Sequence, residues 1–136
     1  MSEPSPKVTV VVPLYNTERY IAKTLESIAA QTYGDYEVVV VNDASTDKGP
    51  EIVGTFMQGD SRIRMVTQEN RGLAGARNSG IRHARGMYIA LLDADDLWHK
   101  EKLARHVLHL DTNPGVGVSY AASRFIDDDG HDMGFG

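Results

Sequence analysis

Short apolar runs alternate with segments of helical periodicity along most of the chain. The runs at 8–12 and 36–41 are rich in valine and almost continuous, which is typical of strands buried on both faces of a sheet. Runs at 63–66, 87–92 and 116–121 also have the length of strands. The pattern therefore predicts five strands, and Pro13 should end the first because proline cannot donate a ladder hydrogen bond.

Between these strands, apolar residues recur at helical spacing and predict four helices, over 17–31, around 52–57, over 73–84 and over 97–110. Asn16 or Thr17 is the expected cap of the first helix, and Gly34 its stop. Asp128, Asp129 and Gly130 predict a hairpin turn, with the neighbouring aspartates as solvated turn residues.

Alternation of strands and helices predicts an α/β fold, a three-layer sandwich of the Rossmann-like kind. Its sheet should be mainly parallel, with right-handed crossovers and helices on both faces. The length of 136 residues predicts one domain over 7–136, preceded by a loose, polar and proline-rich arm over 1–6.

The composition narrows the class of partner. The formal net charge is −5, from 14 Lys and Arg against 19 Asp and Glu, which argues against nucleic acid. No apolar stretch is long enough for a transmembrane segment. The chain has no cysteine, hence no disulfide and no thiolate metal site. We expect a reducing compartment and a cytoplasmic location, at the membrane surface or away from it.

Three carboxylates, Asp93, Asp95 and Asp96, follow the apolar run at 87–92 within four residues. Carboxylates this close repel one another, so such a cluster usually comes with a compensating cation. Mg²⁺ and Mn²⁺ prefer oxygen ligands and bridge to phosphates. The cluster therefore favours a binding site for a metal ion together with a phosphorylated substrate. The alternative is structural: Asp96 caps a helix beginning near Leu97, and the other two are solvated neighbours.

Position favours the metal interpretation. In an open parallel sheet, ligands bind outside the carboxyl ends of the strands. Polar clusters follow three predicted strands, at 13–16, 42–47 and 93–96, and all three should meet at one edge of the sheet. A purely structural role would scatter these side chains over both edges.

The segment 70–80 adds positive charge and small residues that allow close approach of a helix to a backbone or ligand. Arg77 could pair with phosphate, pair with the acidic cluster, or be a solvated charge. The segment 75–80 lacks the Lys-Ser or Lys-Thr ending of a phosphate loop, and no G-x-G-x-x-G follows the first strand. Metal and arginine would therefore neutralise a diphosphate here.

In these clusters, the chain resembles the family 2 glycosyltransferases, which have the GT-A fold. The resemblance spans residues 8 to about 110 and rests on four motifs in the family's order, at 12–16, 40–47, 70–80 and 92–96.

The resemblance implies a role for each matching residue. Pro13 and Tyr15 would line the base pocket of the nucleotide, and Asp43 would hydrogen-bond the base, commonly uracil. Arg77 would lie near the diphosphate, and Asp93 would contact the ribose or the donor sugar. The further implied roles are metal binding by Asp95, to Mg²⁺ or Mn²⁺, and support of the sugar by Asp96.

The family's reaction is transfer of a sugar from a nucleotide-diphospho-sugar, here a UDP-sugar by preference, typically with inversion. The acceptor would be a polysaccharide, a lipid carrier or a protein. The catalytic base is expected beyond Gly136, so these residues should hold the donor and metal half. Two alternatives stay open: a non-catalytic nucleotide-sugar-binding module or fragment, and a metal-dependent phosphohydrolase that uses the same aspartates.

Overall fold

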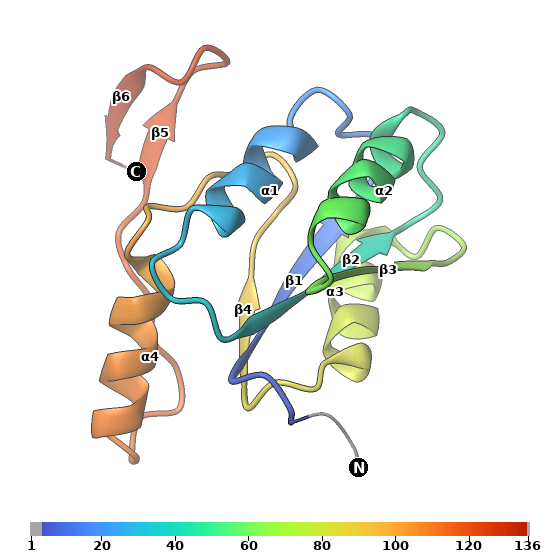
Figure 1. Cartoon of the computed structure of the whole chain (residues 1–136). Helices are drawn as coiled ribbons and strands as arrows, with labels where there is room; N and C mark the ends of the chain where they lie inside the picture. Colours follow the sequence, from blue (N-terminus) through green and yellow to red (C-terminus); the bar gives the residue numbers. More distant parts are fainter. Residues whose placement is uncertain (1–3, 136) are drawn as a thin grey trace. The chain divides into compact units, whose positions relative to one another are not determined.

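The computed structural model describes residues 4–135 (Figure 1). The chain divides into two compact units, the first ending at Lys102 and the second beginning at Leu103. The first unit contains a four-stranded parallel sheet in the order β3-β2-β1-β4. Its strands are β1 (Val8–Leu14), β2 (Tyr36–Asn42), β3 (Ile63–Thr67) and β4 (Tyr88–Leu91).

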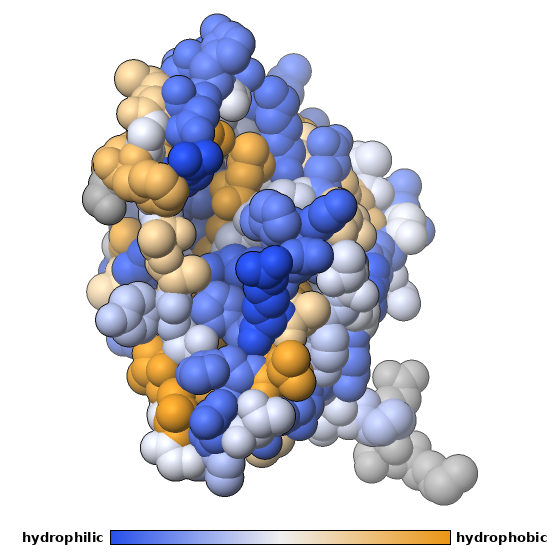
Figure 2. Space-filling model, turned by 90° about the vertical axis from the view of Figure 1, so that its left-hand side faces the viewer, coloured by the Kyte–Doolittle hydropathy of each residue, from blue (hydrophilic) through white to orange (hydrophobic). Residues whose placement is uncertain are grey.

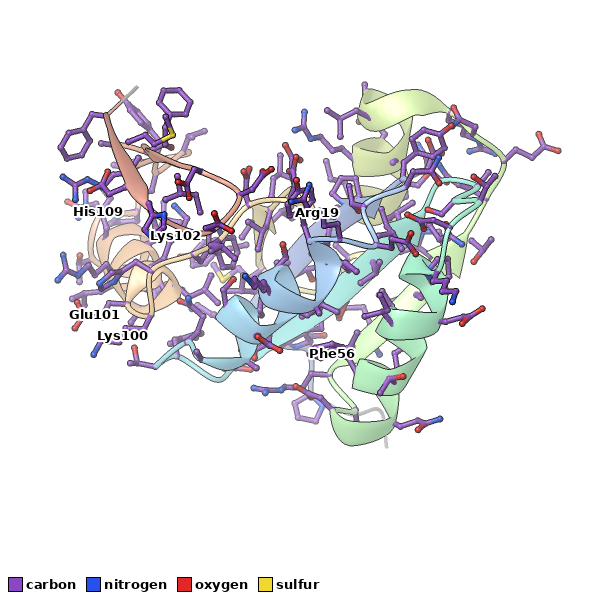
Figure 3. The ribbon with its side chains drawn as sticks, turned by 90° about the horizontal axis from the view of Figure 1, so that it is seen from above. Arg19, Phe56, Lys100, Glu101, Lys102 and His109 are labelled. Carbon is purple, nitrogen blue, oxygen red and sulfur yellow. The ribbon has the colours of Figure 1, made fainter. Side chains whose placement is uncertain are left out.

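Helices cover both faces of this sheet. Helix α3 (Gly72–His83) packs on β1 and β2 from one side, and α1 (Ile21–Ala29) and α2 (Gly49–Gly59) lie together on the other side (Figures 1 and 3). The predicted α/β class with a parallel sheet is confirmed. None of the helices in residues 4–135 is long and apolar enough to span a bilayer.

The core lies around the two central strands. Every residue of β1 and β2 is buried, as their continuous valine-rich runs predict. In β4 half-buried and exposed residues alternate instead, with Ile89 and Leu91 exposed. Within the described residues β4 pairs only with β1, so it is an edge strand of this sheet.

The prediction that Pro13 ends the first strand is wrong, because β1 continues through Leu14. The carbonyl of Val11 accepts a hydrogen bond from the amide of Leu92, so this side of β1 faces β4. Pro13 lies two residues further on and faces the same side, past the last residue that pairs with β4. A missing N–H therefore costs no ladder bond there.

Neither Asn16 nor Thr17 caps α1 through its side chain. The carbonyl of Thr17 accepts hydrogen bonds from the amides of Tyr20 and Ile21, forming a turn before the helix. The side-chain oxygen of Asn16 accepts a hydrogen bond from the amide of Thr46 instead, at 2.8 Å. A contact between two loops has replaced the local cap.

The second unit contains helix α4 (Lys102–Thr112), apart from its first residue, Lys102, which is the last residue of the first unit. It also contains an antiparallel hairpin of β5 (Arg124–Ile126) and β6 (Asp132–Phe135). The turn of the hairpin is the predicted one, and Gly130 adopts a φ of 88° in it. The predicted strand over 116–121 is wrong: it forms no strand, and Val118 and Tyr120 are exposed. Figure 2 shows hydrophobic side chains at the surface among hydrophilic ones.

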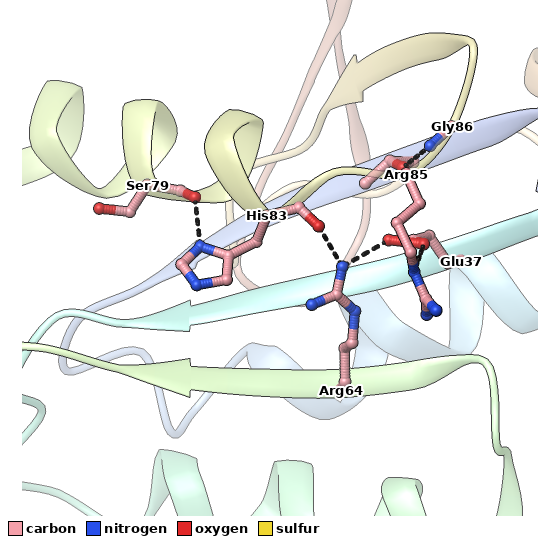
Figure 4. A network of polar contacts seen from close by, with 7 residues as sticks. Glu37, Arg64, Ser79, His83, Arg85 and Gly86 are labelled. Atoms are coloured by element: carbon pink, nitrogen blue, oxygen red, sulfur yellow. Dashed lines mark hydrogen bonds and ion pairs between the residues drawn. The ribbon is translucent and has the colours of Figure 1, made fainter. Parts of the chain in front are cut away.

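An ion-pair network around the buried Glu37 lies near the amino edge of the sheet (Figure 4). The Glu37 carboxylate of β2 accepts hydrogen bonds from Arg64 at 2.8 Å and from Arg85 at 3.2 Å. Arg64 also donates to the carbonyl of His83, the last residue of α3. These contacts tie the carboxyl end of α3 to the sheet, so the amino end of that helix lies toward the opposite edge.

Candidate functional site

An open pocket of about 340 Å³ lies at the carboxyl edge of the sheet. Its walls come from the ends of β1 and β2, the loop after β4, and the amino end of α3 with the residue Asn70 before it. The predicted meeting of three polar clusters at one edge is thus found. The predicted site residues that line the pocket are Pro13, Tyr15, Asp43, Asp93 and Asp95, whereas Arg77 and Asp96 lie outside its lining.

Asp43 is the deeply buried carboxylate of this pocket, only 2% exposed. Its Oδ1 accepts two hydrogen bonds, from Nε2 of Gln68 at 2.9 Å and from the amide of Arg71 at 2.8 Å. Its own amide donates to the carbonyl of Leu14 at 2.9 Å. Backbone and side chain of Asp43 are therefore both held from neighbouring segments.

Arg77 pairs with Asp93. Its Nη2 lies 2.9 Å from one carboxylate oxygen of Asp93 and 3.1 Å from the other, and each side chain is 35% exposed. The pair links α3 to the loop after β4. Of the three alternatives for Arg77, namely pairing with phosphate, pairing with the acidic cluster or solvation, the structure without ligand shows pairing with the acidic cluster.

Asp93, Asp95 and Asp96 each place a carboxylate oxygen within 4.8 Å of the others. Burial raises the pKa of the Asp96 carboxyl, and the negative charges of Asp95 and Asp93 raise it further. The three carboxylates are thus close enough for their negative charges to repel one another. Such a set of hard oxygen donors fits Mg²⁺ or Mn²⁺.

The alternative role of Asp96, as the cap of a helix from Leu97, is wrong, since α4 begins at Lys102. Polar side chains of α1 hold the backbone of this segment instead. Oγ1 of Thr24 donates to the carbonyls of Ala94 and Asp96, at 3.0 and 2.8 Å. Ser27 of the same helix accepts a hydrogen bond from the amide of Trp98, and Gln31, just after the helix, donates one to the carbonyl of His99.

The loops after β1 and β2 also bind each other. The amide of Glu18 donates to the carboxylate of Asp47 at 2.9 Å, and the amide of Lys48 donates to the carboxylate of Glu18 at 3.0 Å. Together with the contact between Asn16 and Thr46, these bonds fix the shape of one side of the pocket.

Sequence reasoning missed several residues at this edge. Thr17, Leu73 and Ala76 line the pocket, and Gln68 supports Asp43 from the residue after β3. The rule that ligands bind at carboxyl ends of strands points to Gln68 too, because β3 is a neighbour of β2. Thr24, Ser27 and Gln31 carry a weaker signal, a polar stripe at helical spacing.

Comparisons with known proteins agree with this arrangement. The family model for glycosyl transferase family 2 matches residues 9–134. The glycosyltransferase GlyA of Streptococcus pneumoniae is 43% identical over 119 residues, which cover 85% of this chain and 17% of GlyA.

Two solved structures share the fold. The mannosyltransferase PcManGT from Pyrobaculum calidifontis, in complex with GDP-Man and Mn²⁺, gives a TM-score of 0.72 at 39% identity, over 79% of this chain and 33% of that one. Residues 1–349 of S. aureus TarS, in complex with UDP-GlcNAc, give 0.75 at 29% identity, over 88% of this chain and 40% of that one.

The predicted GT-A fold is confirmed by these structural neighbours. The chain spans less than half the length of each of these three proteins. The match of the family model over almost the whole sequence shows that the chain belongs to glycosyl transferase family 2.

Proposed function

We propose that this chain forms the donor-binding part of an enzyme that transfers a sugar from a nucleoside-diphosphate sugar to an acceptor hydroxyl, with inversion. The observation that carries the proposal is one pocket that holds both the buried carboxylate of Asp43 and the acidic pair Asp93 and Asp95. The bound ligands of PcManGT and TarS, GDP-Man and UDP-GlcNAc, support a donor of this class. A UDP-sugar is the first candidate.

In this proposal the base lies between Pro13 and Tyr15 at one end of the pocket. Both line it, and Tyr15 is 52% exposed, so its ring is available for stacking. Asp43 accepts a hydrogen bond from an N–H of the base. The donor sugar and ribose then lie toward Asp93, at the other end.

Asp95 would hold Mg²⁺ or Mn²⁺, because it lines the pocket and belongs to the cluster of three carboxylates. When bound, such an ion stabilises negative charge on the departing nucleoside diphosphate. Arg77 holds Asp93 in place and supplies a second positive charge near the diphosphate. Asp96 supports the sugar from the rim.

The acceptor in this proposal is a polysaccharide, a lipid carrier or a protein. None of the described residues is assigned as the catalytic base that deprotonates its hydroxyl. Location in the cytoplasm, at the membrane surface or away from it, also remains a prediction.

Calorimetric titration of UDP into the chain, with Mn²⁺ and again with EDTA, tests the donor site. We expect metal-dependent binding by the wild type. GDP and dTDP under the same conditions test the base. Steady release of phosphate from the nucleotide would instead favour a phosphohydrolase, and binding without transfer in a longer chain with acceptor would favour the binding module.

Two variants separate the two ends of the site. Asp95→Ala should abolish the metal-dependent part of the affinity with little loss of stability, since removing one of several like charges relieves repulsion. Asp43→Ala should weaken binding with or without metal. Metal-dependent affinity that is equal in Asp95→Ala and wild type would contradict the assignment of Asp95.

A further inference from the structure

Within residues 4–135, only one of the two carboxylate oxygens of Asp43 has a hydrogen-bond partner. Oδ1 takes both available donors, the side chain of Gln68 and the amide of Arg71. Among the described residues Oδ2 takes none, and Asp43 lines the pocket. Oδ2 is not among the fully buried polar atoms without a partner, so it is open at the pocket and can accept a hydrogen bond from a ligand.

We propose that Gln68 is a positioning residue for base recognition: its amide fixes Oδ1, so that Oδ2 is presented to the base as a pure acceptor. This inference rests on the proposed function. Arg71 contributes only a backbone donor, so Gln68 is the side chain through which the sequence controls the carboxylate.

The position of Gln68 is itself well determined. It follows the last residue of β3, and its amide donates to the carbonyl of Asn42 at 3.0 Å, directly before Asp43. Asn70 adds a side-chain hydrogen bond to the carbonyl of Asp43 at 3.3 Å. The segment 68–71 thus continues the contact between β2 and β3 past the end of the sheet, and it holds both the backbone and the side chain of Asp43.

A fixed acceptor selects bases by the polarity of their edge. Uracil and guanine present an N–H at the ring nitrogen of this edge, N3 and N1 respectively, which a carboxylate oxygen can accept. Cytosine presents a lone pair at N3, which repels a carboxylate oxygen that is held opposite this ring nitrogen, and its nearest donor is the exocyclic N4 amine beside it. The site should therefore take uridine or guanosine diphosphates and discriminate against cytidine diphosphate.

The test compares UDP and CDP affinities of wild type and Gln68→Met by calorimetry in Mn²⁺. Methionine keeps the length of the side chain but cannot donate. We expect the ratio of UDP to CDP affinity to fall by about fivefold or more, because only UDP uses the oriented oxygen. Gln58→Met, at an exposed position of α2, is the matched control and should keep the wild-type ratio.

The ratio distinguishes positioning from a general loosening of the pocket, which would weaken both nucleotides alike. A thermal melt of each variant checks that the fold is retained. An unchanged ratio in Gln68→Met, with UDP bound by wild type, would overturn the role of Gln68 alone. If the wild type binds none of UDP, GDP and dTDP, the proposed function is overturned, and this inference with it.

Discussion

At the scale of single residues, backbone strain gathers at the edge of the sheet that carries the pocket. Asn16 and Ala44 are the two non-glycine residues in residues 4–135 with positive φ, at 51° and 64°. Each directly follows a pocket-lining residue, Tyr15 or Asp43. Asparagine tolerates this conformation, but alanine does so at a cost of about 1–2 kcal/mol. Asn16 forms hydrogen bonds with Ser45 and Thr46, the two residues that follow Ala44, so the two loops brace each other.

Ala44→Gly should therefore raise the free energy of unfolding by about 0.5–1 kcal/mol, since glycine adopts positive φ freely and loses only part of that gain to the unfolded chain. Urea unfolding measures the change. Ala29→Gly, at the exposed last residue of helix α1, is the control and should not raise stability, since Ala29 has no positive φ to relieve. A loss of stability in Ala44→Gly would contradict the strain argument.

At the scale of elements, α3 owes its place to the small residues that the sequence indicated. A Cβ on Gly80 would clash with Cγ1 of Val11, a fully buried residue of β1. The helix can approach the sheet this closely only where a side chain is missing. The same helix carries Ala76 into the pocket and Arg77 to Asp93, so its distance from the sheet sets the geometry of the site.

Gly80→Ala should lower the free energy of unfolding by about 1–2 kcal/mol, because overpacking against Val11 outweighs the better helix propensity of alanine. Chemical denaturation measures it. Gly54→Ala in α2 is the matched control: its Cβ would meet nothing within 4 Å, so it should gain up to about 1 kcal/mol. Equal effects at the two glycines would show that close packing of α3 is not the cause.

At the scale of the whole molecule, the two edges of the sheet carry different features. The carboxyl edge holds the pocket, and the amino edge carries ion pairs that hold the fold together. Asp60 accepts hydrogen bonds from Nε and Nη2 of Arg62, at 3.0 and 2.9 Å. Arg62 also donates to the carbonyl of Gly34 and lies 4.2 Å from the ring centre of Tyr36.

The side-chain hydrogen bond from Arg62 holds the pKa of Asp60 below its ordinary value of 3.8. Because the folded-state pKa is lowered, ionised Asp60 stabilises the fold at pH values above 3.8, and this contribution disappears as the pH falls through the lowered pKa. Asp60→Asn should therefore be less stable than wild type at neutral pH, and the difference should vanish in acid.

Urea unfolding at a series of pH values measures this difference. Asp35→Asn, at an exposed aspartate outside the pair of Asp60 and Arg62, is the matched control for the loss of one carboxylate. A constant difference between Asp60→Asn and wild type across the acid range would argue against the ion pair as its source.

Much of the fold could be predicted because it follows from local pattern. Continuous valine runs predicted β1 and β2, and small residues predicted the close packing of α3. The failures occurred where tertiary contacts replace local signals. The backbone of Trp98 and His99 bonds to Ser27 of α1 and to Gln31 just after it instead of forming a helix. The apolar run at 116–121 pairs with no strand of residues 4–135.

The sequence by itself determined which segments meet at the candidate site, because the carboxyl ends of parallel strands lie at one edge of the sheet and bring the ends of β1, β2 and β4 together. It also determined the family, through four motifs. Only the tertiary structure decided which atoms face which. The orientation of Asp43 by Gln68, and the support of the acidic loop by Thr24, join residues 25 to 72 positions apart. The pattern of apolar residues determines whether a segment forms a helix or a strand. The distance between side chains that are far apart in the sequence depends instead on how these elements pack.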